Sequence, residues 1–171
     1  MATKLEDKID PALLYETDFY AWAVNQAATL RQLQATRPGL PLDFEHLIEE
    51  VEDLARRDVR AAKSQLRRLM LHVLKLEHSP AERPRRQWLN SVDDARQELD
   101  DILSPSVVAI VLPLLAELYA EARTIARRDL LDVYGDEAAN ALPQTCPYTL
   151  DQLMEKTWYP ANRHGLVDET I

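Results

Sequence analysis

Apolar residues recur at helical spacing along most of the chain, and their pattern predicts four main helices. The first covers residues 18–34 and begins at Thr17 or Asp18. The apolar residues that share its inner face are Phe19, Trp22, Ala23, Leu30 and Leu33. The stretch ATRPGLPLD, with two prolines and one glycine, ends this helix.

The second helix is predicted to be the longest element. Asp43 is a good N-cap, because its carboxylate can accept the free amides of the first turn, and Leu42 and Leu47 are spaced as a hydrophobic staple. Apolar residues then recur from Phe44 to Leu76 without a proline or glycine before HSPAERP. A helix of this length is about 50 Å long at about 1.5 Å per residue, with room for a bend near its middle.

Residues 85–103 form the third predicted helix, with a clear apolar stripe. Ser104 caps the next segment, in which Pro113 either kinks the helix or starts a new one. The pattern favours a short helix followed by a new helix from Leu112. This fourth main helix runs to about Val133, and Gly135 ends it.

Short helices are predicted near both ends. Asp10-Pro11 is a typical helix start and opens a turn over residues 11–15. Thr149 and Gln152 form a capping-box pair for a last helix over residues 150–156.

Together these elements predict an all-α fold, an up-and-down helical bundle of four main helices with short extra helices at both ends. The 171 residues fit one domain. We expect its core to span residues 11–160. The residues before it and the tail over residues 161–171 are expected to be loose.

Charge and composition narrow the classes of partner. A net charge of −9 argues against nucleic-acid binding, which needs a basic face, and it disfavours anionic membrane surfaces. The most apolar stretch, residues 107–116, is too short for a membrane span and contains Pro113. The N-terminus lacks an apolar signal-peptide core, and Cys146 is the single cysteine. We therefore expect a soluble cytoplasmic protein that binds neither membrane nor nucleic acid.

The stretch FEHLIEEVEDLARRD, residues 44–58, holds six acidic side chains and suggests a metal or catalytic site. On a helical wheel most of them point away from the apolar arc, as in a solvated face. A ferritin-like di-iron site needs Glu-x-x-His pairs, and no histidine in the chain follows a glutamate by three residues. We therefore expect no dedicated metal centre and no cofactor.

A magnesium-dependent nucleotide pyrophosphatase is the enzymatic alternative. All-α enzymes of this kind carry Glu-x-x-Glu and Glu-x-x-Asp pairs on neighbouring helices, where carboxylates three residues apart share a hard cation. The weak candidates at this spacing are Glu49 with Glu52 and Glu98 with Asp101. Glu49 and Asp101 face outward from their own apolar stripes, however, and a metal site needs the carboxylates to converge. Magnesium is expected only under this alternative.

Other polar residues point inward. Gln26 lies within the apolar arc of the first helix, and Asp58, Gln65 and His72 recur every seven residues along one edge of the second helix's apolar face. Seven residues span about 10 Å, so these three cannot bond one another directly. Each needs a partner from another helix, because an unpaired buried polar group is costly. They either line a polar cleft or are singly satisfied interior groups.

Five segments occur in the order YETDFYAWAVNQAATLR, LIEEVEDLARRD, LRRLMLHVLKLEHSP, RRQWLNSVDDAR and CPYTLDQL. With these segments in this order, the chain resembles the bacterial domain-of-unknown-function family number twenty-nine over residues 15–160. The resemblance implies a small all-helical bacterial protein of unassigned activity. The family's pattern falls on Asp18, Phe19, Tyr20, Trp22, Gln26, Glu49, Glu50, Glu52, His72, Lys75, Trp88, Arg96, Cys146 and Pro147. This chain departs from the pattern at Leu76 and Gln87, where the family often has tryptophan and serine.

The sequence therefore favours a non-enzymatic helical protein that acts through contact with a protein partner or through self-association. A long amphipathic helix with an acidic outer face suits a partner surface. The alternative is a metal-dependent hydrolase that uses the helix-borne carboxylates.

Overall fold

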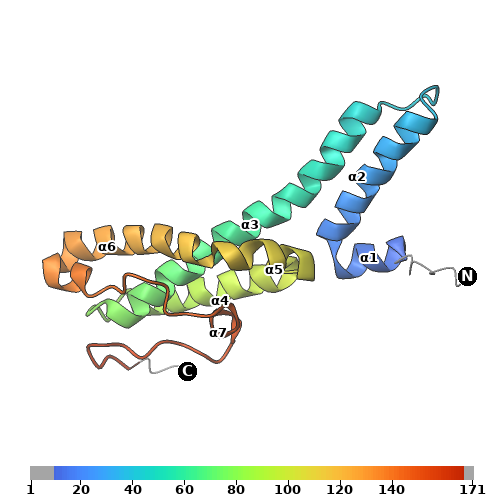
Figure 1. Ribbon diagram of the computed structural model, residues 1–171. Helices are drawn as coiled ribbons and strands as arrows, with labels where there is room; N and C mark the ends of the chain where they lie inside the picture. The colour runs from blue at the N-terminus through green and yellow to red at the C-terminus, as the bar shows by residue number, and fades with distance from the viewer. Residues whose placement is uncertain (1–9, 168–171) are drawn as a thin grey trace, which may run out of the picture.

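The computed structural model describes residues 10–167, and every regular element among them is a helix (Figure 1). In chain order they are α1 (Pro11–Thr17), α2 (Phe19–Thr36), α3 (Phe44–His78), α4 (Arg85–Ile102), α5 (Pro105–Val111), the 3-10 helix η1 (Leu112–Leu114), α6 (Leu115–Asn140) and α7 (Leu150–Met154). The predicted all-α fold is confirmed. Residues 1–9 and 168–171, which belong to the segments expected to be loose, lie outside the described residues.

Helix α3 packs against most of the other helices. It is 35 residues long, and Figure 1 shows that it takes part in two separate groups of helices. Its first half, residues 44–60, runs beside α2 in a two-helix hairpin that projects from the rest of the chain. We call this hairpin, including the turn over residues 37–43, the arm. The second half of α3 lies among α4, α5 and α6, and we call this part the body.

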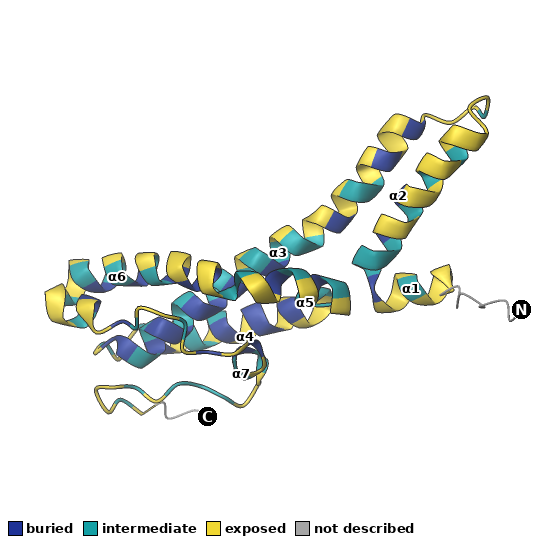
Figure 2. Cartoon of the chain, in the orientation of Figure 1, coloured by how far each residue is buried: buried dark blue, intermediate teal, exposed yellow. Residues whose placement is uncertain are grey.

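The arm and the body have separate cores of very different size. In the arm, the buried apolar residues are Ala23, Ala27, Phe44, Ile48 and Ala55. Three of them, Ala27, Phe44 and Ile48, form a cluster with four partly buried neighbours: Leu30, Leu33, Leu40 and Val51. The body core contains most of the buried apolar side chains and includes Leu66, Leu69 and Leu74 of α3. Figure 2 shows the same contrast, because exposed residues cover much of the arm. The arm is therefore the part of the described chain with the least apolar burial of its own.

The four main helices do not surround one axis, so the up-and-down bundle predicted from the sequence is not the observed arrangement. Helix α2 packs along the first half of α3, whereas α4 and α6 pack along the second half. The physical reason is length. Because α3 has 35 residues and α2 and α4 have 18 each, the two shorter helices lie end to end along it instead of face to face.

The helix starts follow the sequence signals closely. The predicted caps Asp18, Asp43, Ser104 and Thr149 each accept a backbone amide of the helix that follows. Asp10 does the same for α1. Capping groups act on their own local backbone, and for this reason they can be identified from sequence alone.

Pro113 and Gly135 break the chain as predicted, with one difference. The short helix α5 ends at Val111, and the 3-10 turn η1 separates it from α6. Gly135 has φ of +80° inside α6, a left-handed conformation that glycine adopts without steric cost. The prediction that the helix ends there is incomplete, because one more helical turn follows and ends at Asn140.

The segment after Pro160 was expected to be loose, and its described part is not. The side chain of Asn162 donates to the carbonyl oxygen of Leu76 at 2.8 Å, and the backbone amide of Arg163 donates to that of Glu77 at 2.9 Å. Residues 161–167 are thus held against the end of α3. No local residue pattern indicates this contact, because its partners lie about 85 residues apart in the chain.

The stretch from Pro105 to Asn140 is the one helical run in the described chain that is long and apolar enough to cross a membrane. An 18-residue window in it has a mean hydropathy of 1.5, and 28% of that window is buried within the molecule. Val107, Val111, Leu118 and Tyr119 belong to the body core. Packing inside the body therefore accounts for part of its apolar character.

Candidate functional site

The four carboxylates considered for a metal site are spread over different contacts. Glu49 is exposed on the arm, and Glu52 pairs with Arg31 of α2 at 2.5 Å. Glu98 accepts a hydrogen bond from the amide nitrogen of Gln65. No group of three or more His, Cys, Asp or Glu side chains within residues 10–167 is placed to hold a metal ion. Glu52 and Glu98 therefore take part in helix-to-helix contacts, and the four carboxylates do not form a ligand set.

Asp101 lies at a cavity of about 220 Å³ where the arm joins the body. Asp58 lines the same cavity, and Tyr15 and Phe19 lie on its other side. Glu49 is nine residues before Asp58 on α3, which places it about 14 Å further along the helix axis. The cavity is thus lined by Asp101, one of the hydrolase candidates, and by Asp58, one of the inward polar residues.

The inward polar residues lie in different surroundings. Gln26 is half-buried on the arm, while Gln65 reaches α4 through Glu98. His72 has its Nδ1 atom buried without a hydrogen-bond partner within the described chain. Burial, followed by the nearby charges of Lys75 and Arg68, lowers the pKa of His72 to about 4. The four residues thus lie in separate surroundings, and Asp58 lines the cavity at the junction.

Asp18 joins the arm to the body, a role that its predicted capping function does not include. It is 7% exposed, and its carboxylate accepts the amide of Ala21 at 3.0 Å, which caps α2. It also accepts the hydroxyl of Ser104 and the amide of Ser106, both at 2.9 Å, at the start of α5. Burial alone would raise its pKa, but these hydrogen bonds together outweigh burial and lower the pKa. One carboxylate therefore fixes the starts of two helices.

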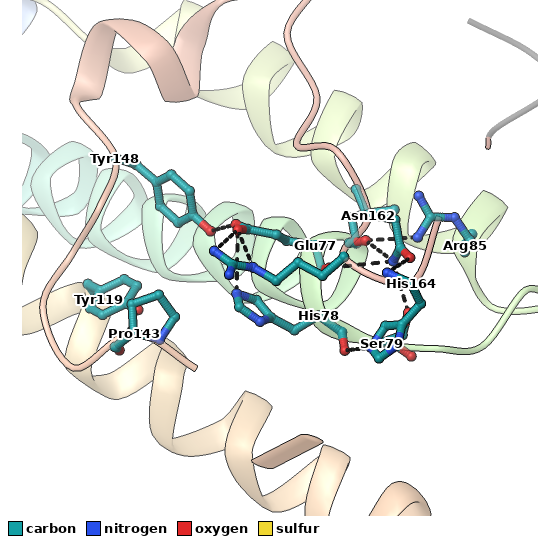
Figure 3. A network of polar contacts seen from close by, with 11 residues as sticks. Glu77, His78, Ser79, Arg85, Tyr119, Pro143, Tyr148, Asn162 and His164 are labelled. Carbon is teal, nitrogen blue, oxygen red and sulfur yellow. Dashed lines mark hydrogen bonds and ion pairs between the residues drawn. The ribbon is translucent and has the colours of Figure 1, made fainter. Parts of the chain in front are cut away.

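A buried polar network closes the far end of the body (Figure 3). Glu77 accepts the hydroxyl of Tyr148 at 2.7 Å and the guanidinium of Arg163 at 2.8 Å. His78 lies beside Glu77, with 3.6 Å between its Nε2 atom and the carboxylate. Sequence reasoning missed this network. The available signal was Glu77 itself, which follows Leu66 by eleven residues, three helical turns, and so lies on the apolar face of α3.

The same network satisfies the carbonyl groups that a helix leaves open at its C-terminus. Arg85 and Asn162 both donate to the carbonyl oxygen of Leu76 at 2.8 Å. Asn162 also donates to that of Ser79 at 2.9 Å, and a ring nitrogen of His164 lies 3.1 Å from the carbonyl oxygen of His78. Figure 3 shows these side chains converging on the helix end. The arrangement is that of a helix cap built from distant segments, and it explains these residues without a ligand.

The arm has one face on which apolar side chains stay partly or fully accessible. On α3, Leu47, Val51 and Leu54 follow one another at helical spacing. On α2, the half-buried residues at the same kind of spacing are Trp22, Gln26 and Leu33. We call these six residues the arm face. The ion pair of Arg31 with Glu52 lies on the opposite side of the hairpin, because the helical period turns both residues away from the two stripes.

The arm face continues an edge of α3 that is covered in the body. Gln65 follows Leu54 by eleven residues, so the two lie on the same edge of the helix. At Gln65, α4 covers this edge through Glu98. In the arm the edge is bare, because α4 ends at Ile102, and Leu47 and Leu54 are 41% and 38% exposed. Sequence periodicity placed both leucines on the apolar face but could not show that α4 stops short of them.

Comparison with known proteins gives a family and a fold but no activity. The family model described as domain of unknown function DUF29 matches residues 14–159. The crystal structure of an alpha-helical protein of unknown function from Rhodospirillum rubrum is similar, with 26% sequence identity and a TM-score of 0.71. The match covers 84% of this chain and 90% of that one. No curated protein matches the chain.

Proposed function

Since the chain belongs to the family described as domain of unknown function DUF29, we propose a function from the structure alone: a non-enzymatic helical protein that contacts another protein chain through the arm face. The observation that carries the proposal is the pair of exposed leucines, Leu47 and Leu54, which share the arm face with the half-buried apolar residues Val51, Trp22 and Leu33. Contiguous apolar surface on a projecting element is typical of a protein interaction site.

The composition of α2 supports the same function. Its 18 residues contain one charged side chain, Arg31, and its outward-facing residues include Val24 and Ala28. A helix that faces water on one side is normally charged there. A helix with this composition is better suited to a position between two protein surfaces. The small core of the arm supports the same function, because a hairpin with five buried apolar residues, three of them alanines, gains stability from a partner that covers it.

The charge distribution of the arm favours binding of a specific partner over non-specific association. The acidic outer side of α3, with Glu49, Glu50 and Asp53, keeps that side hydrated, while the arm face itself carries no charged side chain. Contact is thereby directed to one side of the hairpin. Exposed polar residues at the rim around an apolar centre are the usual anatomy of a protein interface.

A photocrosslinking amino acid at position 47, in the full chain expressed in cells, tests the proposal. We expect adducts of one defined mass from position 47 and none from the same amino acid at Asp132, an exposed control position on α6. Leu54→Asp should remove the adduct at position 47 while the thermal unfolding midpoint is maintained. Equal labelling from positions 47 and 132 would show that the arm face is not a contact site.

A further inference from the structure

We propose that the arm face binds one amphipathic helix of another protein, and that this helix carries lysine or arginine at its N-terminal end. The inference rests on the proposed function and specifies the chemistry of the partner. The bound helix lies along α2 and α3, with its apolar residues against Leu47, Leu54 and Trp22. Apolar residues three and four positions apart on one helix are the usual anchors of this binding mode.

The place for this helix is the part of α3 that α4 does not reach. In the body, α4 covers the edge of α3 at Gln65. It ends at Ile102, and the arm projects beyond it (Figure 1). From Asp58 to Leu47 the bare edge is eleven residues long, about 16 Å or three helical turns. A bound helix of this length continues the line of α4 along the arm, and it needs no part of the edge that α4 covers.

The charge of the cavity at the junction of arm and body determines the chemistry of the partner. Four carboxylates and no basic side chain line this cavity: Glu16, Asp58, Asp100 and Asp101. Asp100 pairs with Lys156 at 2.5 Å, and Asp58 has a 3.6 Å approach to the adjacent Arg57. Glu16 and Asp101 have no ion pair within residues 10–167. The root of the arm face thus has excess negative charge, which complements a basic segment of a partner.

The size and the walls of the cavity fit a lysine or arginine side chain. Its volume is about 220 Å³, against about 30 Å³ for one water molecule. Tyr15, Phe19 and Tyr20 line it together with the carboxylates. Aromatic rings attract the charged groups of lysine and arginine, and they also pack against the apolar stems of these side chains. An organic cation therefore satisfies both kinds of wall.

The end of α4 gives the bound helix its direction. Ile102 and Leu103 line the cavity, so the C-terminus of α4 lies there with its partial negative charge. The N-terminus of a helix carries the opposite partial charge and has free amide groups, for which carboxylates are good acceptors. The N-terminal end of the bound helix is therefore favoured at the cavity, and its C-terminal end at the tip of the arm.

Two synthetic peptides of about 12 residues test the inference on the full chain. Both carry leucines three and four positions apart, one with two lysines at its N-terminal end and the other with two glutamates there. Fluorescence anisotropy of the labelled peptides should show about 5-fold tighter binding of the lysine peptide, because the cavity attracts it and repels the other. The dipole of the free peptide favours the glutamates, so a preference for lysine must come from the protein.

A charge reversal at the cavity should remove this preference. Asp101→Lys is suited to the purpose, because Asp101 lies in the last turn of α4, where the helix dipole favours lysine. Glu16→Lys, exposed on α1, is a second variant at the same cavity. Glu49→Lys is the matched control, since it makes the same change on the side of α3 away from the arm face. In NMR spectra the lysine peptide should shift the indole signal of Trp22 and leave that of Trp158, in the body, in place.

The outcomes separate this inference from the proposed function. Equal affinity for the two peptides, or no binding of either at about 1 mM, overturns the inference. A preference that survives both cavity variants, with their folding checked by circular dichroism, also overturns it. A lysine peptide of reversed sequence that binds equally well contradicts the direction of the helix. If position 47 gives an adduct in cells but neither peptide binds, the partner has a different chemistry, so the inference fails and the proposed function stands. No adduct and no peptide binding remove both.

Discussion

The guanidinium of Arg96 donates a hydrogen bond of 2.7 Å from Nη2 to the carbonyl oxygen of Trp158, 62 residues further along the chain. A second bond of 2.8 Å runs from its Nε to the carbonyl oxygen of Leu153. The side chain is 2% exposed, and its guanidinium lies 5.0 Å from the ring centre of Tyr159. One buried cation thus holds the segment that follows α7 against α4.

Arg96→Lys should therefore lower the free energy of unfolding by about 2–4 kcal/mol, because an ammonium group cannot replace the planar fork and leaves buried carbonyl groups unpaired. Urea unfolding followed by circular dichroism measures the change. Arg86→Lys, an exposed position on the same helix, is the control and should change the free energy by less than about 0.5 kcal/mol. Equal effects of the two substitutions would mean that the clamp adds nothing to stability.

Asp18→Asn should destabilise the protein at neutral pH by about 1–2 kcal/mol, since a capping and charge-assisted acceptor is replaced by a neutral amide. The pKa of Asp18 is lowered in the folded chain, so its contribution is present above the unfolded pKa of 3.8 and is lost as the pH falls through the folded value. The difference between wild type and variant should shrink below about pH 4. Urea unfolding at pH 7 and pH 3 measures this. A constant difference would show that the charge of Asp18 is not involved.

The features that depend on neighbouring residues could be predicted from the sequence, whereas contacts between residues far apart in the chain could not. Caps such as Asp18 and breaks such as Gly135 act on their own backbone, so their positions could be read from the residues. The bundle was mispredicted because periodicity gives the apolar face of α3 but not which helix covers each half of it. The roles of Arg96 and Glu77 were missed because their partners lie far along the chain, among residues 148–163, and no residue pattern indicates which helix that part packs against.

The candidate site shows the same limit. The heptad spacing of Asp58, Gln65 and His72 follows the edge of α3 that α4 covers at Gln65 and leaves bare at Leu54. The acidic stretch over residues 44–58 suggested a metal or catalytic site because it holds six acidic side chains. The proposed function rests instead on Leu47 and Leu54, which stay exposed because α4 ends at Ile102. No pattern within α3 itself could show where α4 ends against it.

His72 should give the stability a defined dependence on pH. Its pKa is about 4 in the folded chain, mainly because burial disfavours the charged ring, against 6.5 for the free side chain. Between these values the unfolded chain binds a proton that the folded chain does not. Stability should thus be independent of His72 above about pH 7 and fall as the pH decreases from 6.5 to about 4.

His72→Gln should flatten this dependence. Burial also lowers the pKa of His78, so the variant removes part of the slope and not all of it. The measurement is urea unfolding at pH 7, 6 and 5, together with an NMR titration of the His72 ring. An NMR titration midpoint near 6.5 would contradict the burial assigned to this side chain, and an unchanged slope in the variant would assign the effect to His78.

The last prediction concerns local stability in the arm. Amide hydrogen exchange depends on local opening, and the arm has few buried apolar residues, so its amides in an isolated chain should exchange far faster than those of the body. Leu54→Asp changes an exposed side chain of the arm and should leave the slow exchange of the body, around Leu69 and Val73, unchanged. Mass spectrometry of peptic fragments measures exchange in both parts. Protection of residues 44–58 as strong as that of the body would show that the hairpin is stable alone and that its exposed leucines need no cover.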